Sequence, residues 1–346
     1  MTWASRLRAT WAGDRRRWLL GAATSALLSS FVHPGVTLNR PRYDHIVVFD
    51  VTQSMNVRDQ QLDGEAVSRL DFAKHAFRQA LLTLPCGSKV GWAIFTEYRS
   101  FLLFAPVEVC ANIGELRATL AHVGGAMAWS GNSEVAKGVH SAIGIAKLLP
   151  GTPSLVFVTD GQEAPPLNPR YRPQFDDKPG DIGGLLVGVG GSLPVPIPKS
   201  DALGRPLGFW KADEVMQTDP RSQGRGASVS GERLVDDGPA GGSTALGATP
   251  GSEHLSSLRE AYLRLLAGEQ GFPFLRLQQA DALSAALQSA ALAKPVPVRL
   301  DLQPALAALA FLLMLASSAG PVLQHLRRLR RASSKHKEKH KEKQMR

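Results

Sequence analysis

An aspartate followed by two hydroxyl residues at alternate positions stands near the start of this 346-residue chain. Asp50, Thr52 and Ser54 come directly after the apolar run Ile46–Phe49. A run without a polar face predicts a strand buried on both sides, whose last residue reaches the carboxyl edge of a parallel sheet. One carboxylate and two hydroxyls suit a hard cation such as Mg²⁺, Mn²⁺ or Ca²⁺. The alternative is an aspartate that only caps the next helix.

Two later loops carry matching oxygen donors. Ser133 precedes a predicted helix, and Asp160 leaves a buried apolar run in the sequence Thr-Asp-Gly. Because all three loops follow strands or precede helices, we expect them at the same edge of the sheet. The absence of His and Cys from this set favours Mg²⁺ over zinc or copper. The predicted metal ligands are therefore Asp50, Thr52, Ser54, Ser133 and Asp160.

Alternating apolar patterns predict a doubly wound α/β domain over residues 43–292, with a mostly parallel sheet. Helices are expected over 69–84, 112–122, 133–149, 255–266 and 280–292, and strands over 46–50, 89–95, 100–107, 154–158, 185–189 and 272–277. Strands 89–95 and 100–107 form a predicted hairpin, which adds one antiparallel edge strand. Ser252 is the expected cap of the fourth helix.

Two segments of this region have no clear period. Residues 191–251 are rich in Pro, Gly and Ser, which indicates either a long functional loop or partial disorder. Phe209 and Trp210 are the large apolar pair expected to hold this segment against the domain. Residues 294–303 are a predicted proline-containing linker.

The net charge of +10 is concentrated at the two ends of the chain. Residues 1–17 and 324–346 together carry 15 basic and 3 acidic residues, which leaves 25 basic and 27 acidic residues elsewhere. A near-neutral domain argues against nucleic-acid binding. Pro304–Leu323 contains no charge, so residues 303–323 are a predicted transmembrane helix, with a buried soluble helix as the alternative.

Residues 18–36 follow three arginines and predict a second membrane anchor or, alternatively, a cleaved signal sequence. Because basic residues flank the cytoplasmic side of a span, both termini are expected in the cytoplasm. The domain would then lie in the periplasm, attached to the bacterial inner membrane. Cys86 and Cys110 would lie in this oxidising compartment, either as a disulfide or as two buried thiols.

The five oxygen donors resemble the metal-ion-dependent adhesion site of the von Willebrand factor A family, whose pattern is DxSxS, a threonine, and an aspartate in a TDG-type turn. Thr52 replaces the first serine and Ser133 the threonine, and both keep a hydroxyl. The resemblance implies that Thr52 and Ser54 bind Mg²⁺ directly. It implies that Ser133 and Asp160 act directly or through water, and that Asp50 holds the metal or its waters. A partner protein's carboxylate would fill the open position.

Longer strings resemble the MxaL family, the membrane-anchored von Willebrand A proteins of bacterial methanol-dehydrogenase gene clusters. They are LPCGSKVGWAIFTEYRSFLLFAPVEVC, AWSGNSEVAKG and FVTDGQEAPPLNP. This resemblance implies a role in maturation of periplasmic methanol dehydrogenase, through insertion of its Ca²⁺. It also implies cooperation with other maturation proteins and an AAA+ ATPase.

Two other functions fit parts of the pattern. One is a general envelope-stress or aerotolerance protein of the related membrane-bound von Willebrand A group. The other is a phosphohydrolase with Asp50 as nucleophile, which would need a second acid where this chain has Thr52. Because P-loop, GxSxG and HExxH motifs are absent from the sequence, we expect a binding module and not an enzyme. Glu134 and Glu163 flank the site and are expected to be exposed, solvated acids, with contact to a partner or a second ion as the alternative.

Overall fold

The computed structural model describes residues 3–32, 34–167, 171–201, 203–217, 229, 232–236 and 251–318. The chain divides into two compact units, Met1–Arg40 with Val296–Arg346, and Pro41–Pro295. In the first unit, helix α1 (Trp3–Ser30) leads to strand β1 (Gly35–Arg42), which pairs with β16 (Lys294–Asp301). Residues 303–318 are helical.

The predicted linker over residues 294–303 is therefore wrong, because most of it forms β16. Pro295 and Pro297 are compatible with this strand, since each strand of a two-stranded sheet has a free edge where no backbone N–H is needed.

Among the described residues, no helix combines the length and the apolar character needed to cross a membrane. The predicted transmembrane helices are not confirmed, and residues 319–346 lie outside the described part of the chain.

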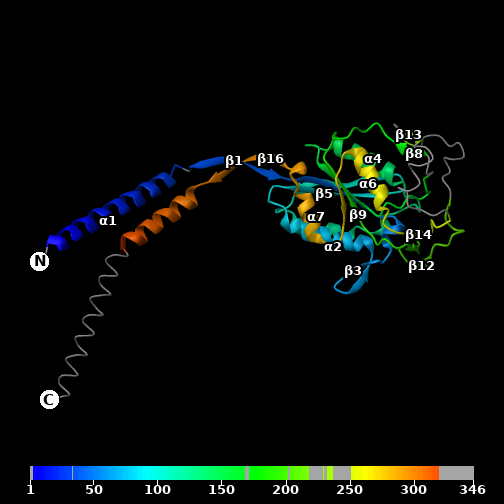
Figure 1. The fold of residues 1–346 in the computed structure, drawn as a ribbon, viewed down its shortest axis with the longest axis horizontal. Coiled ribbons are helices and arrows are strands. Elements are labelled where there is room, and N and C mark those ends of the chain that lie inside the picture. The colour runs from blue at the N-terminus through cyan, green and yellow to red at the C-terminus, as the bar shows by residue number, and fades with distance from the viewer. Residues whose placement is uncertain are drawn as a thin grey trace, which may run out of the picture. The chain divides into compact units, whose positions relative to one another are not determined.

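The second unit is built on a six-stranded sheet with the order β15-β9-β7-β2-β5-β6. Its strands are β2 (Asp44–Asp50), β5 (Lys89–Thr96), β6 (Arg99–Glu108), β7 (Ser154–Thr159), β9 (Gly184–Gly188) and β15 (Phe274–Arg276). All neighbours pair in parallel except β5 and β6, which form an antiparallel hairpin. The predicted mixed α/β class is confirmed (Figure 1). The one antiparallel edge strand of the central sheet is β6.

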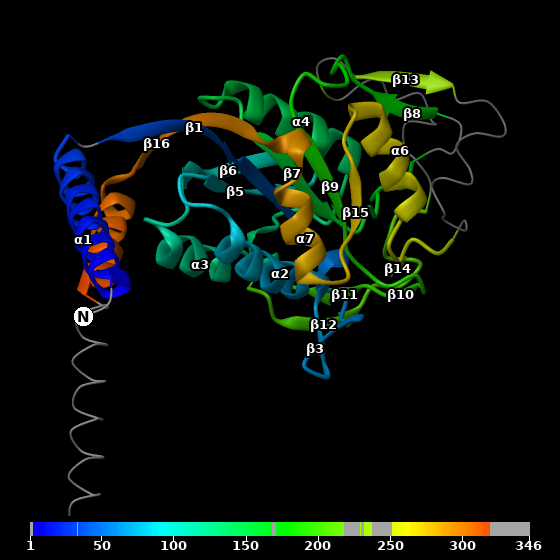
Figure 2. The same cartoon turned by 60° about the vertical axis from the view of Figure 1, so that its left-hand side comes forward.

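Helices cover both faces of this sheet (Figure 2). One hydrophobic core contains residues of α2 (Arg69–Thr83), α3 (Ile113–His122) and α7 (Ala280–Leu287). The other contains residues of α4 (Val135–Leu148) and α6 (Glu260–Gln270). Strand β2 serves both, because Val47 and Phe49 belong to the first core while Ile46 and Val48 belong to the second. This alternation explains why a central parallel strand has no polar face.

Short elements complete the second unit. They are the 3₁₀ turns η1 (Gln53–Asn56), η2 (Gly125–Met127) and η4 (Ala290–Leu292), and the paired strands β3 (Gln60–Leu62) with β4 (Glu65–Val67), β8 (Tyr171–Gln174) with β13 (Arg233–Asp236), β10 (Val195–Pro196) with β14 (Leu255–Ser256), and β11 (Pro198–Ser200) with β12 (Pro206–Phe209). Segment 191–251 therefore contributes short strands where it is described.

Cys86 and Cys110 form a disulfide, which settles the choice between a bridge and free thiols.

The predicted helix over residues 255–266 begins five residues too early. Leu255 and Ser256 pair with β10 as strand β14, and α6 starts only at Glu260. Its N-cap is Arg259 and not Ser252, and the Arg259 backbone N–H donates to the Asp160 carbonyl oxygen at 2.9 Å. A long-range contact to the third loop therefore fixes the helix start. The predicted helix over 280–292 ends at Leu287 and continues after a break as η4.

Candidate metal site

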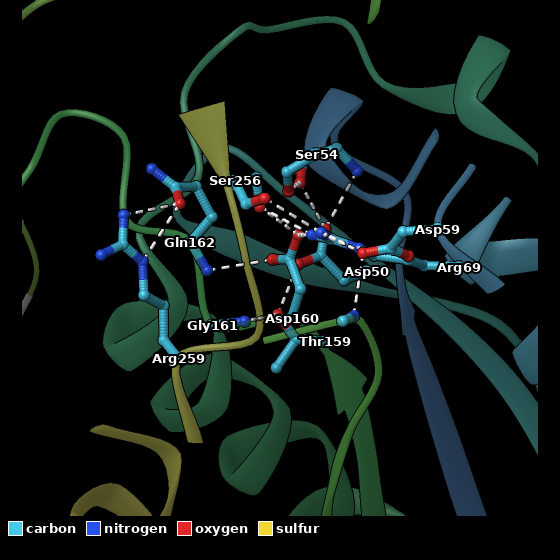
Figure 3. A network of polar contacts seen from close by, with 12 residues as sticks. Asp50, Ser54, Asp59, Arg69, Thr159, Asp160, Gly161, Gln162, Ser256 and Arg259 are labelled. Carbon is cyan, nitrogen blue, oxygen red and sulfur yellow. Dashed lines mark hydrogen bonds and ion pairs between the residues drawn. The ribbon is translucent and has the colours of Figure 1, made fainter. Parts of the chain in front are cut away.

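Two of the three loops leave neighbouring parallel strands. Strands β2 and β7 pair with Phe49 opposite Val158, so Asp50 and Asp160 emerge close together at the carboxyl edge of the sheet. The Thr159 hydroxyl connects the two loops, because its Oγ1 donates to Asp50 Oδ2 at 2.6 Å. Both aspartate side chains are fully buried. The expected convergence of these two loops is observed (Figure 3).

The loop that carries Ser133 is held between the other parts of this edge. The Ser133 N–H donates to the Ala164 carbonyl at 2.6 Å, and the Ala164 N–H returns a bond at 2.8 Å. On the other side, the Glu97 N–H donates to the Asn132 carbonyl at 3.1 Å. Backbone bonds to the loops after β5 and β7 therefore bring Ser133 to the site, although its loop does not leave a strand of the central sheet.

Asp50 orients the first hydroxyl of the site. Its Oδ1 accepts hydrogen bonds from the Thr52 backbone N–H at 2.9 Å and from Thr52 Oγ1 at 2.7 Å. Because the Thr52 hydroxyl donates its hydrogen bond to Asp50, its oxygen lone pairs remain available to another group. Ser54 Oγ lies 3.3 Å from Thr52 Oγ1. The two hydroxyl oxygens of the first turn therefore lie together.

Ser133 supplies the third hydroxyl. Its side chain is 2 % exposed, and its Oγ has no hydrogen-bond partner among the described residues. A buried, unpaired polar atom calls for an explanation such as an unseen ion. Of such atoms among the described residues, only Ser133 Oγ belongs to a residue that lines the cavity with Thr52 and Ser54. Thr52, Ser54 and Ser133 line the same cavity, which has a volume of about 280 Å³. The donor set fits a hard cation, since its neutral hydroxyls face the cavity and its carboxylates lie beneath them.

The raised pKa of Asp50 also favours a cation at this site. Burial and the neighbouring Asp160 raise the pKa of Asp50 to about 7, against the opposing hydrogen bonds from Thr159 and Thr52. A buried carboxylate of this kind is destabilised in its charged form unless a positive charge accompanies it. A cation at the three hydroxyls would supply that charge.

Asp160 lies in the site but has a partner that sequence reasoning missed. The guanidinium of Arg69, at the first position of α2, donates from Nη1 to Asp160 Oδ2 at 2.5 Å and to Ser256 Oγ at 2.7 Å. Its Nε and Nη2 donate to Asp59, at 3.1 and 2.7 Å. Partial burial acts to raise the pKa of Asp59, but the Arg69 guanidinium holds it below its usual value. An arginine that starts an amphipathic helix gives no sequence signal of this role.

The two flanking glutamates are not solvated as expected. Glu163 is 7 % exposed, and its Oε1 accepts from Tyr262 Oη at 2.5 Å and from the Ala136 N–H at 3.1 Å. Glu134 pairs with Lys137, with Oε2 and Nζ 2.6 Å apart. For Glu163 the reason is that the N-terminus of α4 offers unpaired backbone N–H groups, which attract a carboxylate. For Glu134 the reason is the neighbouring Lys137 ammonium. Both glutamates support the loop and do not extend the site.

Part of segment 191–217 forms the opposite wall of the cavity. Ile197, Trp210, Val215 and Met216 line it together with the hydroxyls. Trp210 Nε1 donates to Gln53 Oε1 in η1 at 2.6 Å, which holds this wall against the first turn. Of the predicted apolar pair, Trp210 therefore anchors the segment. Phe209 does not, because it is 59 % exposed.

Comparison with known proteins finds no matching family model and no matching curated protein. Among solved structures, an aerotolerance-related membrane protein from Bacteroides fragilis matches with 16% identity, 71% coverage of this chain and 96% of that chain, and a TM-score of 0.43. The conserved hypothetical protein BatB from Bacteroides thetaiotaomicron matches with 14% identity, coverages of 71% and 95%, and a TM-score of 0.44. The ArnB paralog VWA2 from Sulfolobus acidocaldarius matches with 8% identity, coverages of 73% and 46%, and a TM-score of 0.34. Likenesses this distant assign no activity to the chain.

Proposed function

We propose that this chain is a von Willebrand A-type binding module in which a divalent cation links the domain to a partner protein. The observation that carries the proposal is the buried Ser133 hydroxyl, which lacks a partner among the described residues and shares a cavity with Thr52 and Ser54. Mg²⁺ fits this set of hard oxygen donors best, and Mn²⁺ and Ca²⁺ also suit it.

In this proposal each residue has a distinct task. Thr52, Ser54 and Ser133 offer hydroxyl oxygens to the cation. Asp50 accepts a hydrogen bond from the Thr52 hydroxyl, which leaves the lone pairs of that hydroxyl free for the cation. Asp50 and Asp160 supply negative charge from beneath. A bound cation would provide a position for a carboxylate of the partner protein. The cavity wall formed by Trp210 and its neighbours limits the approach to that position.

The same geometry supports binding in preference to catalysis. An aspartyl-phosphate mechanism needs a carboxylate oxygen that can attack a substrate. Asp50 is fully buried, and its two oxygens accept bonds from Thr52 and Thr159. The hydroxyls of Thr52 and Ser54, and not the Asp50 carboxylate, line the cavity. We therefore propose that the module does not turn over a substrate.

We further propose that the chain is attached to the bacterial inner membrane, with the domain in the periplasm and both basic ends in the cytoplasm. The uncharged run 304–323 and the positive charges beyond it support this orientation. The Cys86–Cys110 disulfide also supports it, because disulfides persist in the periplasm and are rare in the cytoplasm.

Two more specific roles follow from this location. The MxaL resemblance favours assembly of methanol dehydrogenase, with insertion of its Ca²⁺ by maturation proteins and an AAA+ ATPase. The alternative is an envelope-stress or aerotolerance role, and the aerotolerance-related membrane protein from Bacteroides fragilis among the structural neighbours fits this alternative better. Gene deletion separates the two roles. Loss of growth on methanol indicates the first, and sensitivity to oxygen or envelope stress with normal growth on methanol indicates the second.

Capture of partners tests the cation-dependent binding. The full-length chain is solubilised from membranes in detergent, and bound proteins are identified with Mg²⁺ or with a chelator. We expect specific partners only with Mg²⁺, and none with Asp50→Asn. Asp44→Asn is the control, because it makes the same chemical change at the other end of strand β2. The Asp44 carboxylate pairs with Lys294, at 3.5 Å from its Nζ, and does not belong to the proposed site. Capture that persists in chelator would overturn the proposal.

A further inference from the structure

We propose that Arg69 is a built-in counter-cation: its guanidinium, and not the divalent cation, is the partner of Asp160. The cation site would then work with one carboxylate, Asp50, and the three hydroxyls of Thr52, Ser54 and Ser133. This inference rests on the function proposed above and refines it. It departs from the role that the family resemblance implies for Asp160.

The bonds made by Asp160 leave neither of its oxygens without a protein donor. Oδ2 accepts from Arg69 Nη1 at 2.5 Å and from Ser256 Oγ at 3.0 Å, and Oδ1 accepts from the Gln162 N–H at 2.9 Å. The side chains of Arg69 and Asp160 are both 0% exposed. The pair is therefore a buried, charge-assisted bond of the strongest kind (Figure 3).

Arg69 is itself held in place on every side of its guanidinium. Nε donates to both Asp59 oxygens at 3.1 Å, Nη2 donates to Asp59 Oδ2 at 2.7 Å and to the Ser256 carbonyl at 3.1 Å, and Nη1 donates to Ser256 Oγ at 2.7 Å. Asp59 Oδ2 in turn accepts from the Gly191 N–H at 2.8 Å. Backbone also closes over the arginine, since a Cβ at Gly190 would lie 2.9 Å from Arg69 Nε.

This arrangement sets the charge of the cation site. The single positive charge of Arg69 is shared between Asp160 and Asp59 and offsets part of the negative charge of Asp160, so Asp50 is the one carboxylate of the site without an arginine partner. Arg69 also repels the cation directly, because the repulsion between two positive charges extends over several ångströms in a poorly solvated interior. The expected result is a site that binds its cation less tightly than it would without Arg69.

Three variants of the purified full-length chain in detergent test the inference, with Mn²⁺ affinity measured by electron paramagnetic resonance of the free ion. Arg69→Met releases Asp160 as a second carboxylate and should bind Mn²⁺ about tenfold more tightly or better. The double variant Arg69→Met/Asp160→Asn removes a neutral pair and should stay within about threefold of wild type. Arg69→Lys keeps the positive charge but not the bonding geometry of the guanidinium, so its affinity should lie closer to wild type than that of Arg69→Met.

The double variant decides the matter even if Arg69→Met alone fails to fold, because removing both partners of a buried pair is tolerated better than removing one. Loss of Mn²⁺ binding by the double variant to the level of Asp50→Asn, with folding intact by circular dichroism, would show that Asp160 is a ligand and overturn the inference. Unchanged affinity in folded Arg69→Met would also overturn it. If wild type itself binds no Mn²⁺, the proposed function fails instead.

Discussion

Ser133 and Ser100 are both buried serines, but only one of their hydroxyls has a partner. Ser100 Oγ donates to the Gly138 carbonyl at 2.9 Å, whereas Ser133 Oγ has no partner among the described residues. A satisfied buried hydroxyl contributes to stability, while an unsatisfied one costs free energy. A residue that is unfavourable for the metal-free fold but lies in a cavity with two other hydroxyls supports the proposed cation site.

Substitution of these two serines separates stability from binding. We expect Ser133→Ala to leave the free energy of unfolding in chelator unchanged or slightly raised, and to weaken Mn²⁺ binding. Ser100→Ala should lower the free energy of unfolding by about 1 kcal/mol and leave Mn²⁺ binding intact. Urea unfolding and Mn²⁺ titration of both variants check this. Equal loss of stability in chelator would contradict the assignment of Ser133.

Asp50 should make the metal-free protein sensitive to pH below neutrality. Its pKa is raised by burial from 3.8 to about 7, so the folded state binds a proton that the unfolded state has already lost. The resulting stability is fully present below the unfolded pKa and is lost as the pH rises through about 7. In chelator, this contribution should therefore lower the melting temperature as the pH rises from about 4 to about 7, and the decline should level off above pH 7.

Asp50→Asn is the control for this pH dependence, because an amide does not titrate in this range. The variant should lack this component of the decline, and saturating Mg²⁺ should reduce it in wild type by favouring the ionised carboxylate. His45 acts in the opposite direction, because burial lowers its pKa from 6.5 to about 4 and its contribution to stability therefore rises with pH up to about 6.5. Asp50→Asn keeps His45, so the difference between wild type and variant isolates the Asp50 component. A decline of the same size in Asp50→Asn would assign the effect to another group.

At the scale of elements, helix α4 positions the loop that carries Ser133. The helix follows that loop directly and packs against the sheet in the second core, with Val135, Val139 and Ile143 buried. Its close approach to β5 depends on Gly138, where a Cβ would lie 2.2 Å from the Phe95 ring. Gly144 on the same helix is exposed, and a Cβ there would have nothing within 4 Å.

The two glycines therefore form a matched pair for mutation. Gly138→Ala should lower the free energy of unfolding by about 1–3 kcal/mol, because a methyl group must displace the Phe95 ring in a packed core. Gly144→Ala should raise it by up to about 1 kcal/mol, because alanine favours the helix over glycine at an open position. Denaturant unfolding measures both changes. If both variants lost stability equally, the close packing at Gly138 would not be the cause.

At the scale of the whole molecule, the proposed attachment to the inner membrane has a direct test. The full-length chain should remain with membranes after washing with high salt or alkaline carbonate, which removes peripheral proteins. In spheroplasts, added protease should digest the 43–292 domain, while an epitope placed after residue 346 should stay protected until the membrane is opened. Release of the chain by carbonate would contradict the proposed spans.

The sequence alone determined the type of sheet and the place of its first carboxylate. The run Ile46–Phe49 is buried on both faces of the sheet, and this double burial is what excludes polar residues from the strand. The hairpin of β5 and β6 and the convergence of the Asp50 and Asp160 loops also followed from local composition and strand direction. These features depend on neighbours along the chain or on the geometry of parallel pairing.

Only the tertiary structure decided how the site is completed. Arg69 and Asp160 lie 91 positions apart, and Trp210 and Gln53 lie 157 apart, so their pairing leaves no local pattern. The contact of Arg259 with the Asp160 carbonyl likewise fixed the start of α6 against its helical period. Buried charges and loop contacts depend on which distant groups share a low-dielectric space, and that is set by the packing of the whole domain.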